Sequence, residues 1–240
     1  MAAYQKLSQS GKLRERLKAA VSLLESCSVC PRHCAVNRLE GDAGECCTSR
    51  EAMVFSYGPH FGEEAPELAA DLGLCIPLVY NSGGYDSVET LRILDGIIDI
   101  DMPDMKYNDE EIARQLSGID NYPEINKAAI EEMHRQVGDL EINEDGVAQR
   151  GLFVRHLVLP YGLAGTKRIV EYLSKEISPD TYVNIMSQYH PCHKAFQIQS
   201  LYRRISSTEF RKALFLTKES GLTRLDKAVI IEAFHPDLSG

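Results

Sequence analysis

Four short, mostly apolar runs follow one another over the second part of the chain. They cover residues 76–80, 97–100, 153–159 and 182–186. Apolar runs of this length, without polar alternation, are typical of strands that are buried on both faces of a parallel sheet. The pattern therefore predicts about four parallel strands.

Helical patterns separate these runs. Apolar residues recur at helical spacing over residues 88–94, from about residue 108, over 123–137, over 164–176, and after residue 206. Pro123 suits a first helical position and Gly138 a helix end, and Ser206 with Glu209 forms a capping-box pattern. Strands that alternate with helices indicate an α/β fold with a parallel sheet and right-handed crossovers.

The N-terminal segment has a different pattern. Leu13, Leu17, Val21 and Leu24 follow a helical period, and Ser10 is a suitable N-cap. This predicted helix leads directly into a cysteine-rich segment. After about residue 67 the sequence changes to short apolar runs that alternate with helical patterns. We therefore predict two domains: an N-terminal helix with a cysteine-rich metal-binding module over residues 1–67, and an α/β domain over 68–240.

Composition narrows the classes of function. The 240 residues are 44% hydrophobic and 25% charged, and this balance allows a buried core. The net charge of −9 argues against nucleic-acid binding, which needs Lys and Arg to neutralise phosphates. We expect no membrane association and no secretory signal, because no apolar stretch is long enough for either. The predicted location is cytoplasmic; an N-terminus without acidic residues before Glu15 leaves organelle targeting as the alternative.

The cysteines are unevenly distributed. Five of the seven lie between residues 27 and 47, and four of these have the spacing of metal ligands: Cys27, Cys30, Cys34 and Cys46. A two-residue gap lets two thiolates from one turn reach the same ion, and a distant cysteine completes the set. Thiolates select zinc or an iron–sulfur cluster, and spacing alone does not separate the two. The alternative is a set of free or buried cysteines without a metal.

Several motifs, taken in order along nearly the whole chain, carry a family resemblance. They are Cys-x-x-Cys-Pro-Arg-x-Cys-x-Val-Asn-Arg (27–38), His-Phe-Gly-Glu-Glu (60–64), Val-Tyr-Asn-Ser (79–82), Met-Pro-Asp-Met-Lys-Tyr (102–107), Arg-His-Leu-Val-Leu-Pro (155–160) and Val-Asn-Ile-Met-Ser-Gln-Tyr (183–189). Together they resemble the radical S-adenosylmethionine proteins described as pyruvate formate-lyase activating enzyme-like.

The resemblance implies a partial (β/α)6 barrel with S-adenosylmethionine and a 4Fe–4S cluster at the carboxyl ends of the strands. It implies reductive cleavage of S-adenosylmethionine to a 5′-deoxyadenosyl radical, with a glycyl-radical protein or another molecule as the substrate. By the same resemblance, Asp104 and Lys106 lie beside the amino acid part of the cofactor, Arg155 reaches its carboxylate, His190 lies near it, and Asn81 lines the same cavity.

One departure from the family bears on activity. The Cys-x-x-x-Cys-x-x-Cys loop that holds the catalytic cluster in the family is absent, and Glu64 runs almost directly into what resembles the end of a later helix. Two strand–helix units, about 60–80 residues, are missing. The remaining cysteine set has gaps of two and then three residues plus a fourth ligand, so it is coordinatively closed. The chain is thus expected to be a barrel remnant that is inactive in radical generation.

Two other interpretations remain open. The first is a non-catalytic protein whose four-cysteine module binds zinc or an iron–sulfur cluster and serves in interaction or assembly. The second, an unrelated open α/β ligand binder, lacks the glycine-rich phosphate loop that would support it. Asp104 and Lys106 could also form an ordinary solvated ion pair at a strand end.

Overall fold

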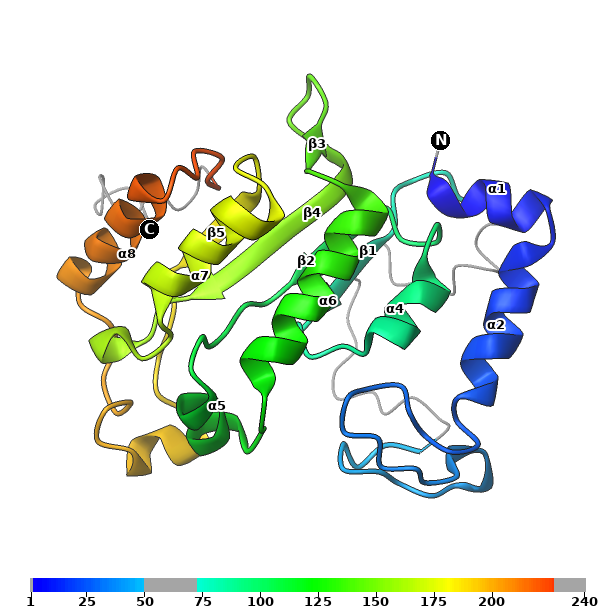
Figure 1. Cartoon of the computed structure of the whole chain (residues 1–240), viewed down its shortest axis with the longest axis horizontal. Helices are drawn as coiled ribbons and strands as arrows, with labels where there is room; N and C mark the ends of the chain where they lie inside the picture. Colours follow the sequence, from blue (N-terminus) through cyan, green and yellow to red (C-terminus); the bar gives the residue numbers. More distant parts are fainter. Residues whose placement is uncertain (1, 50–72, 227–240) are drawn as a thin grey trace.

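The computed structural model describes residues 2–49 and 73–226, and it places one mixed sheet beside a layer of helices (Figure 1). Four strands are parallel and lie side by side in chain order: β1 (Val79–Ser82), β2 (Ile100–Pro103), β4 (Ala148–Leu157) and β5 (Tyr182–Met186). A two-residue strand, β3 (Glu141–Ile142), pairs antiparallel with the start of β4. The predicted α/β class with a mainly parallel sheet is confirmed.

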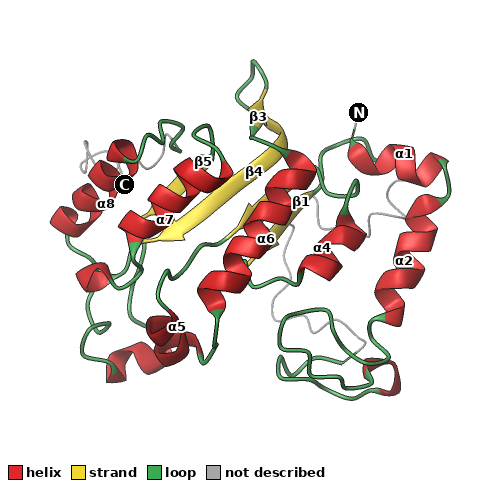
Figure 2. Cartoon of the chain, in the orientation of Figure 1, coloured by secondary structure: helices red, strands yellow, loops and turns green. Residues whose placement is uncertain are grey.

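The crossover helices cover one face of this sheet (Figure 2). They are α4 (Val88–Leu94), α6 (Tyr122–Val137) and α7 (Thr166–Tyr172), and α7 continues as a π-helical turn over Leu173–Ile177. Two further helices, α5 (Glu110–Ser117) and α8 (Ser207–Glu219), follow β2 and β5. Sequential strands with their crossover helices on one face are also the pattern of a β/α barrel. The partial (β/α)6 barrel itself stays a prediction. In the two described segments, no helix is long and apolar enough to cross a bilayer.

Alternation along β4 shows how the sheet separates its two faces. Leu152, Val154 and His156 are fully buried against the helices. The residues between them, such as Arg155 and Leu157, are only half-buried and lie on the opposite face, because successive strand residues point to opposite sides. We call this second face the open face, since the crossover helices lie on the other side.

The helix boundaries follow from local chemistry. The side chains of Ser87, Asp109 and Ser206 each accept a hydrogen bond from a backbone N–H in the first turn of α4, α5 and α8. The predicted capping box of Ser206 and Glu209 is present at α8, and Gly138 ends α6 as predicted. These signals are readable in the sequence because the interacting groups lie within a few residues of one another.

The predicted N-terminal helix is present as α2 (Lys12–Ser22), but its predicted cap is wrong. Another helix, α1 (Ala3–Gln9), precedes it; Ser10 ends α1, and Gly11 is the N-cap of α2. Gly11 has a φ of 73° and turns the chain between them. Of the predicted apolar face, Leu13 is buried, but Leu17 and Val21 are largely exposed.

The N-terminal helices nevertheless pack against the α/β unit. Tyr4 is fully buried, the backbone N–H of Ala3 donates to Asp99 at 2.7 Å, and the Arg16 side chain donates to the carbonyl of Ile93 at 2.8 Å. The junction at residues 64–72, where the sequence resemblance predicts the loss of a cluster loop, and the predicted domain boundary at 67/68 both lie outside the described residues.

Asp101 generates a testable prediction. Its carboxyl group is buried on the helical side of β2, beside Tyr80 and Leu152 in the sheet register, and burial together with the charge of Asp86 raises its pKa to about 7. An unfolded aspartate titrates near about 3.9. Between these values the folded chain binds more protons than the unfolded chain, so the free energy of unfolding falls as pH rises towards 7.

We therefore expect Asp101→Asn to leave stability almost unchanged at pH 4 and to raise it at pH 8, by up to about 4 kcal/mol. Urea unfolding at both pH values measures the difference, with Asp145→Asn in the exposed β3–β4 hairpin as the matched control. Equal stability differences at the two pH values would contradict the assignment.

Candidate ligand site and cysteine module

Three of the predicted binding residues meet where the parallel strands end. Asn81 lies on β1, Asp104 directly follows β2, and Arg155 lies near the end of β4. Asp104 pairs with Arg155 across the sheet as an isolated bridge. All three side chains therefore reach the open face at the carboxyl edge, where α/β proteins bind their ligands.

One carboxylate joins the charged groups. Asp104 Oδ1 lies 2.7 Å from Arg155 Nη2, and Asp104 Oδ2 accepts a hydrogen bond from Lys106 Nζ at 2.8 Å. Arg155 Nη2 also donates to Asn81 Oδ1 at 2.7 Å. We call these four residues the strand-end network. It carries one negative and two positive charges, so its net charge is +1.

The N-terminal part of α6 holds the loops that carry this network. The buried Asn126 amide donates to the carbonyls of Gly84 and Asp104, at 2.8 and 2.9 Å, and the Tyr122 hydroxyl accepts a hydrogen bond from the backbone N–H of Lys106 at 3.0 Å. A Cβ on Gly84 would collide with the Asp104 carbonyl, so the loop after β1 needs a glycine there. The network thus rests on a rigid support.

His156 provides a second support from the helical side. One ring nitrogen lies 2.7 Å from the carbonyl oxygen of Met105, and the other lies 2.9 Å from the Thr166 hydroxyl. Complete burial lowers its pKa to about 4, so the ring is neutral at physiological pH. It ties the segment after β2 to α7 without adding a charge near the network.

Asn184 is a neighbour of the network that the sequence analysis missed. It lies on β5 directly opposite Arg155 in the register. Its Oδ1 atom and the Nε atom of Arg155 are buried and have no hydrogen-bond partner within the described part of the chain. The sequence feature that could have identified Asn184 is its place as a polar residue between two apolar strand residues, Val183 and Ile185, which are both buried. Unpaired buried polar atoms are rare and call for an explanation, and a ligand is one.

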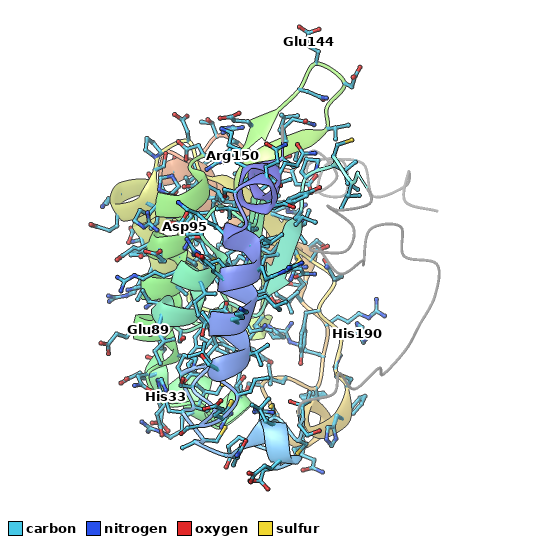
Figure 3. The ribbon with its side chains drawn as sticks, turned by 90° about the vertical axis from the view of Figure 1, so that its right-hand side faces the viewer. His33, Glu89, Asp95, Glu144, Arg150 and His190 are labelled. Carbon is cyan, nitrogen blue, oxygen red and sulfur yellow. The ribbon has the colours of Figure 1, made fainter. Side chains whose placement is uncertain are left out.

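His190 does not join this group. Its ring is exposed, and the hydrogen bond that the structure gives it is to the carbonyl of Gln188, two residues away, at 3.2 Å. Figure 3 shows it projecting on the side of the sheet opposite Glu89 and Asp95, which belong to the helical side. Among the described residues, no hydrogen bond or ion pair links His190 to the strand-end network, so its position near the ligand stays a prediction.

The predicted metal module is organised around an arginine. Arg38 is buried, and its Nε donates to Cys27 Sγ at 2.8 Å while its Nη2 donates to Cys46 Sγ at 3.1 Å and Cys34 Sγ at 4.0 Å. Three of the four predicted thiols therefore surround one guanidinium group. Cys30 does not contact it. Arg38 is part of the cysteine-rich motif, but the spacing of the cysteines does not predict this role.

This arrangement changes the acidity of two thiols. The Thr48 hydroxyl, and then the Arg38 guanidinium, lower the pKa of Cys46 to about 7. Burial tends to raise the pKa of Cys27, but the hydrogen bond from Arg38 outweighs it, so that pKa also lies below the ordinary value. Thiolates are the form that binds metal.

Thiolates of Cys27, Cys30, Cys34 and Cys46 are suitable ligands for a thiophilic metal ion, but their arrangement in this structure is not that of a metal site. Among residues 2–49 and 73–226, no group of three or more Cys, His, Asp or Glu side chains has the arrangement of a metal site. The guanidinium lies where the sulfurs converge, and Cys30 would have to join them. A close approach is built in at Gly44, where a Cβ would lie 2.6 Å from both Cys34 Sγ and Arg38 Nη2.

Gly44 offers a direct test of the module. We expect Gly44→Ala to displace the Cys34 thiol, because the added Cβ would lie 2.6 Å from its Sγ atom, and to lower the affinity for zinc about tenfold, because one misplaced ligand weakens the whole set. Competition with a chromophoric chelator measures the affinity. Ala43→Ser, at the exposed neighbouring position, is the control. Equal zinc affinity in the two variants would exclude the proposed role of these thiols.

Comparison with known proteins gives one relevant similarity. No family model matches the chain. An uncharacterized protein of Methanocaldococcus jannaschii is 33% identical over 148 residues, which make up 61% of this chain and 39% of that protein. The chain thus spans about two fifths of the length of the curated relative that it matches.

Proposed function

We propose that this chain is a radical S-adenosylmethionine-type protein that retains the ligand-binding edge of its sheet and lacks the catalytic cluster. One observation carries the proposal. Asn81, Asp104, Lys106 and Arg155, which the family resemblance assigns to the cofactor, form one connected network at the carboxyl ends of neighbouring parallel strands.

The chemistry of the network suits the amino acid part of S-adenosylmethionine. That part carries a carboxylate, an ammonium group and a nearby sulfonium. Arg155 and Lys106 supply cations for the carboxylate, and a planar guanidinium can bind two oxygens at once. Asp104 supplies the negative charge that the ammonium group needs.

The cysteine module would hold a metal in a closed site. Cys27, Cys30, Cys34 and Cys46 would bind zinc or an iron–sulfur cluster through four thiolates, and such a set leaves no open coordination position. The catalytic 4Fe–4S cluster of the family needs a separate trio of cysteines, and neither Cys75 nor Cys192 has neighbours at that spacing. The chain would therefore bind the cofactor without cleaving it.

The length of the relative is consistent with a lost segment. The same aligned 148 residues are a smaller share of the relative than of this chain, so that protein is longer. A longer protein has room for the two missing strand–helix units and for a hydrogen-abstracting reaction on a glycyl-radical protein or another substrate. Those activities are proposed for the parent family, and we propose none of them for this chain.

A second candidate is a non-catalytic metal-binding protein that acts in assembly. It is favoured by the attachment of the cysteine module to the α/β unit, where the Thr90 hydroxyl of α4 donates to the carbonyl of Val29 at 2.8 Å. Metal analysis separates the candidates: zinc without sulfide favours an assembly module, and iron with acid-labile sulfide favours an auxiliary cluster.

The network generates a binding prediction. We expect S-adenosylmethionine to bind the chain and Arg155→Met to weaken this binding about 10–100-fold, because the variant removes a charge-assisted contact. Isothermal titration calorimetry measures both affinities. Arg204→Met, at an exposed position before α8, is the matched control and should bind like the wild type. Equal affinity in the two variants would refute the assignment of the strand-end network.

The absence of the cluster trio generates a second prediction. After anaerobic reconstitution with iron and sulfide and addition of a strong reductant, we expect no 5′-deoxyadenosine above the level of a protein-free control. Chromatography with mass detection measures the product. Formation of 5′-deoxyadenosine in proportion to protein concentration would overturn the closed-site interpretation.

A further inference from the structure

A partly open pocket of about 220 Å³ adjoins the strand-end network. Asp104 and Lys106 form its polar end. The rest is mainly apolar, with side chains that come from α5, the ends of β4 and β5, and the segments that follow: Leu116, Leu157, Leu159, Met186 and Leu201. The Tyr189 hydroxyl donates to the carbonyl of Leu201 at 2.7 Å and so fixes one wall. A cavity of this kind, apolar with a few polar groups at one end, is typical of a ligand site.

The sheet register places the cavity directly after the polar row. Arg155 pairs with Asn184, and two residues further along the same strands Leu157 pairs with Met186. Two strand residues span about 7 Å. The open face therefore presents a polar layer and, about 7 Å beyond it, an apolar layer.

The polar layer has unused hydrogen-bonding capacity of both kinds. Arg155 Nε is a buried donor without a partner in the described residues, and Lys106 Nζ has N–H groups beyond the one that Asp104 accepts. Asn184 Oδ1 is a buried acceptor without a partner there. With a net charge of +1, this layer matches a carboxylate that has a hydrogen-bond donor beside it.

We infer that this site binds an α-amino acid with an uncharged, apolar side chain. The carboxylate pairs with Arg155 and Lys106, the ammonium group donates to Asn184 and faces Asp104, and the side chain fills the cavity. An apolar cavity of about 150 Å³ is known to accept benzene, so 220 Å³ admits a branched aliphatic chain or one aromatic ring.

This inference goes beyond the proposed function: it rests on the same strand-end network but assigns a different ligand to it. A sulfonium placed in the apolar cavity would lose its hydration without gaining a counter-charge, and that loss is costly. A neutral side chain gains from burial there. The cavity therefore favours a free apolar amino acid over the methionyl part of a sulfonium cofactor.

Calorimetric titration of the full chain with glycine, alanine, norvaline, leucine and phenylalanine tests the cavity. We expect the affinity to rise about fourfold for each added methylene until the cavity is filled. Ala195→Phe adds a ring to the cavity wall without touching the polar layer, and it should abolish this rise. A thermal melt confirms that the variant is folded. Affinities that do not depend on the side chain overturn the inference.

A second variant tests the polar layer. Asn184→Leu keeps the side-chain size and removes the unpaired acceptor, so leucine should bind about tenfold more weakly. The binding of 4-methylpentanoate, which has the same apolar chain and no amine, should not change. Gln149→Leu, at an exposed position near the start of β4, is the control. Equal losses for the two ligands in Asn184→Leu refute amine recognition by Asn184.

The outcomes separate this inference from the proposed function. Binding of S-adenosylmethionine without binding of apolar amino acids overturns the inference and leaves the proposed function standing. Binding of leucine without S-adenosylmethionine supports the inference and removes the proposed cofactor. If neither ligand binds, both fail.

Discussion

The Asp104 carboxylate is the interaction on which the site depends. It holds Arg155 through one oxygen and Lys106 through the other, and it does so only if β1, β2 and β4 end at matching levels. A shift of one residue in any of these strands would move its side chains to the opposite face. The geometry of the site therefore depends on the register of the sheet, because the ion pairs form only when these strands pair as they do. The side chains of this network are partly shielded from water, so their attraction is less screened than that of a surface pair.

Hydrogen bonds from the helical side of the sheet hold the residues of the site in this geometry. Asn126 and Tyr122 fix the loops after β1 and β2, and the neutral His156 fixes the segment that follows Asp104. Groups held in this way need little reorganisation when a ligand arrives, and preorganisation is what turns hydrogen bonds into affinity. The same layer contains a less favourable feature, the buried Asp101 carboxyl, whose raised pKa reports the cost of placing a charge there. Asp101 lies on β2 and Asp104 directly follows this strand, so a residue that affects stability and a residue of the site are close neighbours in the chain.

The sequence predicts what is encoded locally and misses what depends on register or tertiary contacts. Helix α4 and the capping box of α8 follow from short-range patterns, and β5 lies over its predicted range. Asn81, Asp104, Lys106 and Arg155 were predicted from family motifs at strand ends, whereas Asn184 gains its place only from the pairing of β4 with β5. Arg38 was missed because nothing in the spacing of cysteines shows that a cation lies among them. The error at the N-terminus has a similar cause: Ser10 lies close to the start of the predicted helix, but the sequence does not show that Gly11 takes the N-cap position.

Arg38 also connects the two interpretations of the cysteine module. A guanidinium among three sulfurs stabilises thiolates by charge, as a metal does, but it forms no coordinate bonds and leaves Cys30 aside. A metal bound by all four thiolates would occupy the position where the sulfur atoms converge, and it would displace the Arg38 guanidinium group outward. There its N–H groups could still donate to the sulfurs, and such outer donors orient ligands and tune the properties of the centre. A closed centre of this kind would stabilise the local fold. In the described residues, the open face of the sheet presents the buried, unpaired Arg155 Nε and Asn184 Oδ1 atoms beside a partly open pocket, and this combination is why the ligand proposals concern the sheet and not the cysteines.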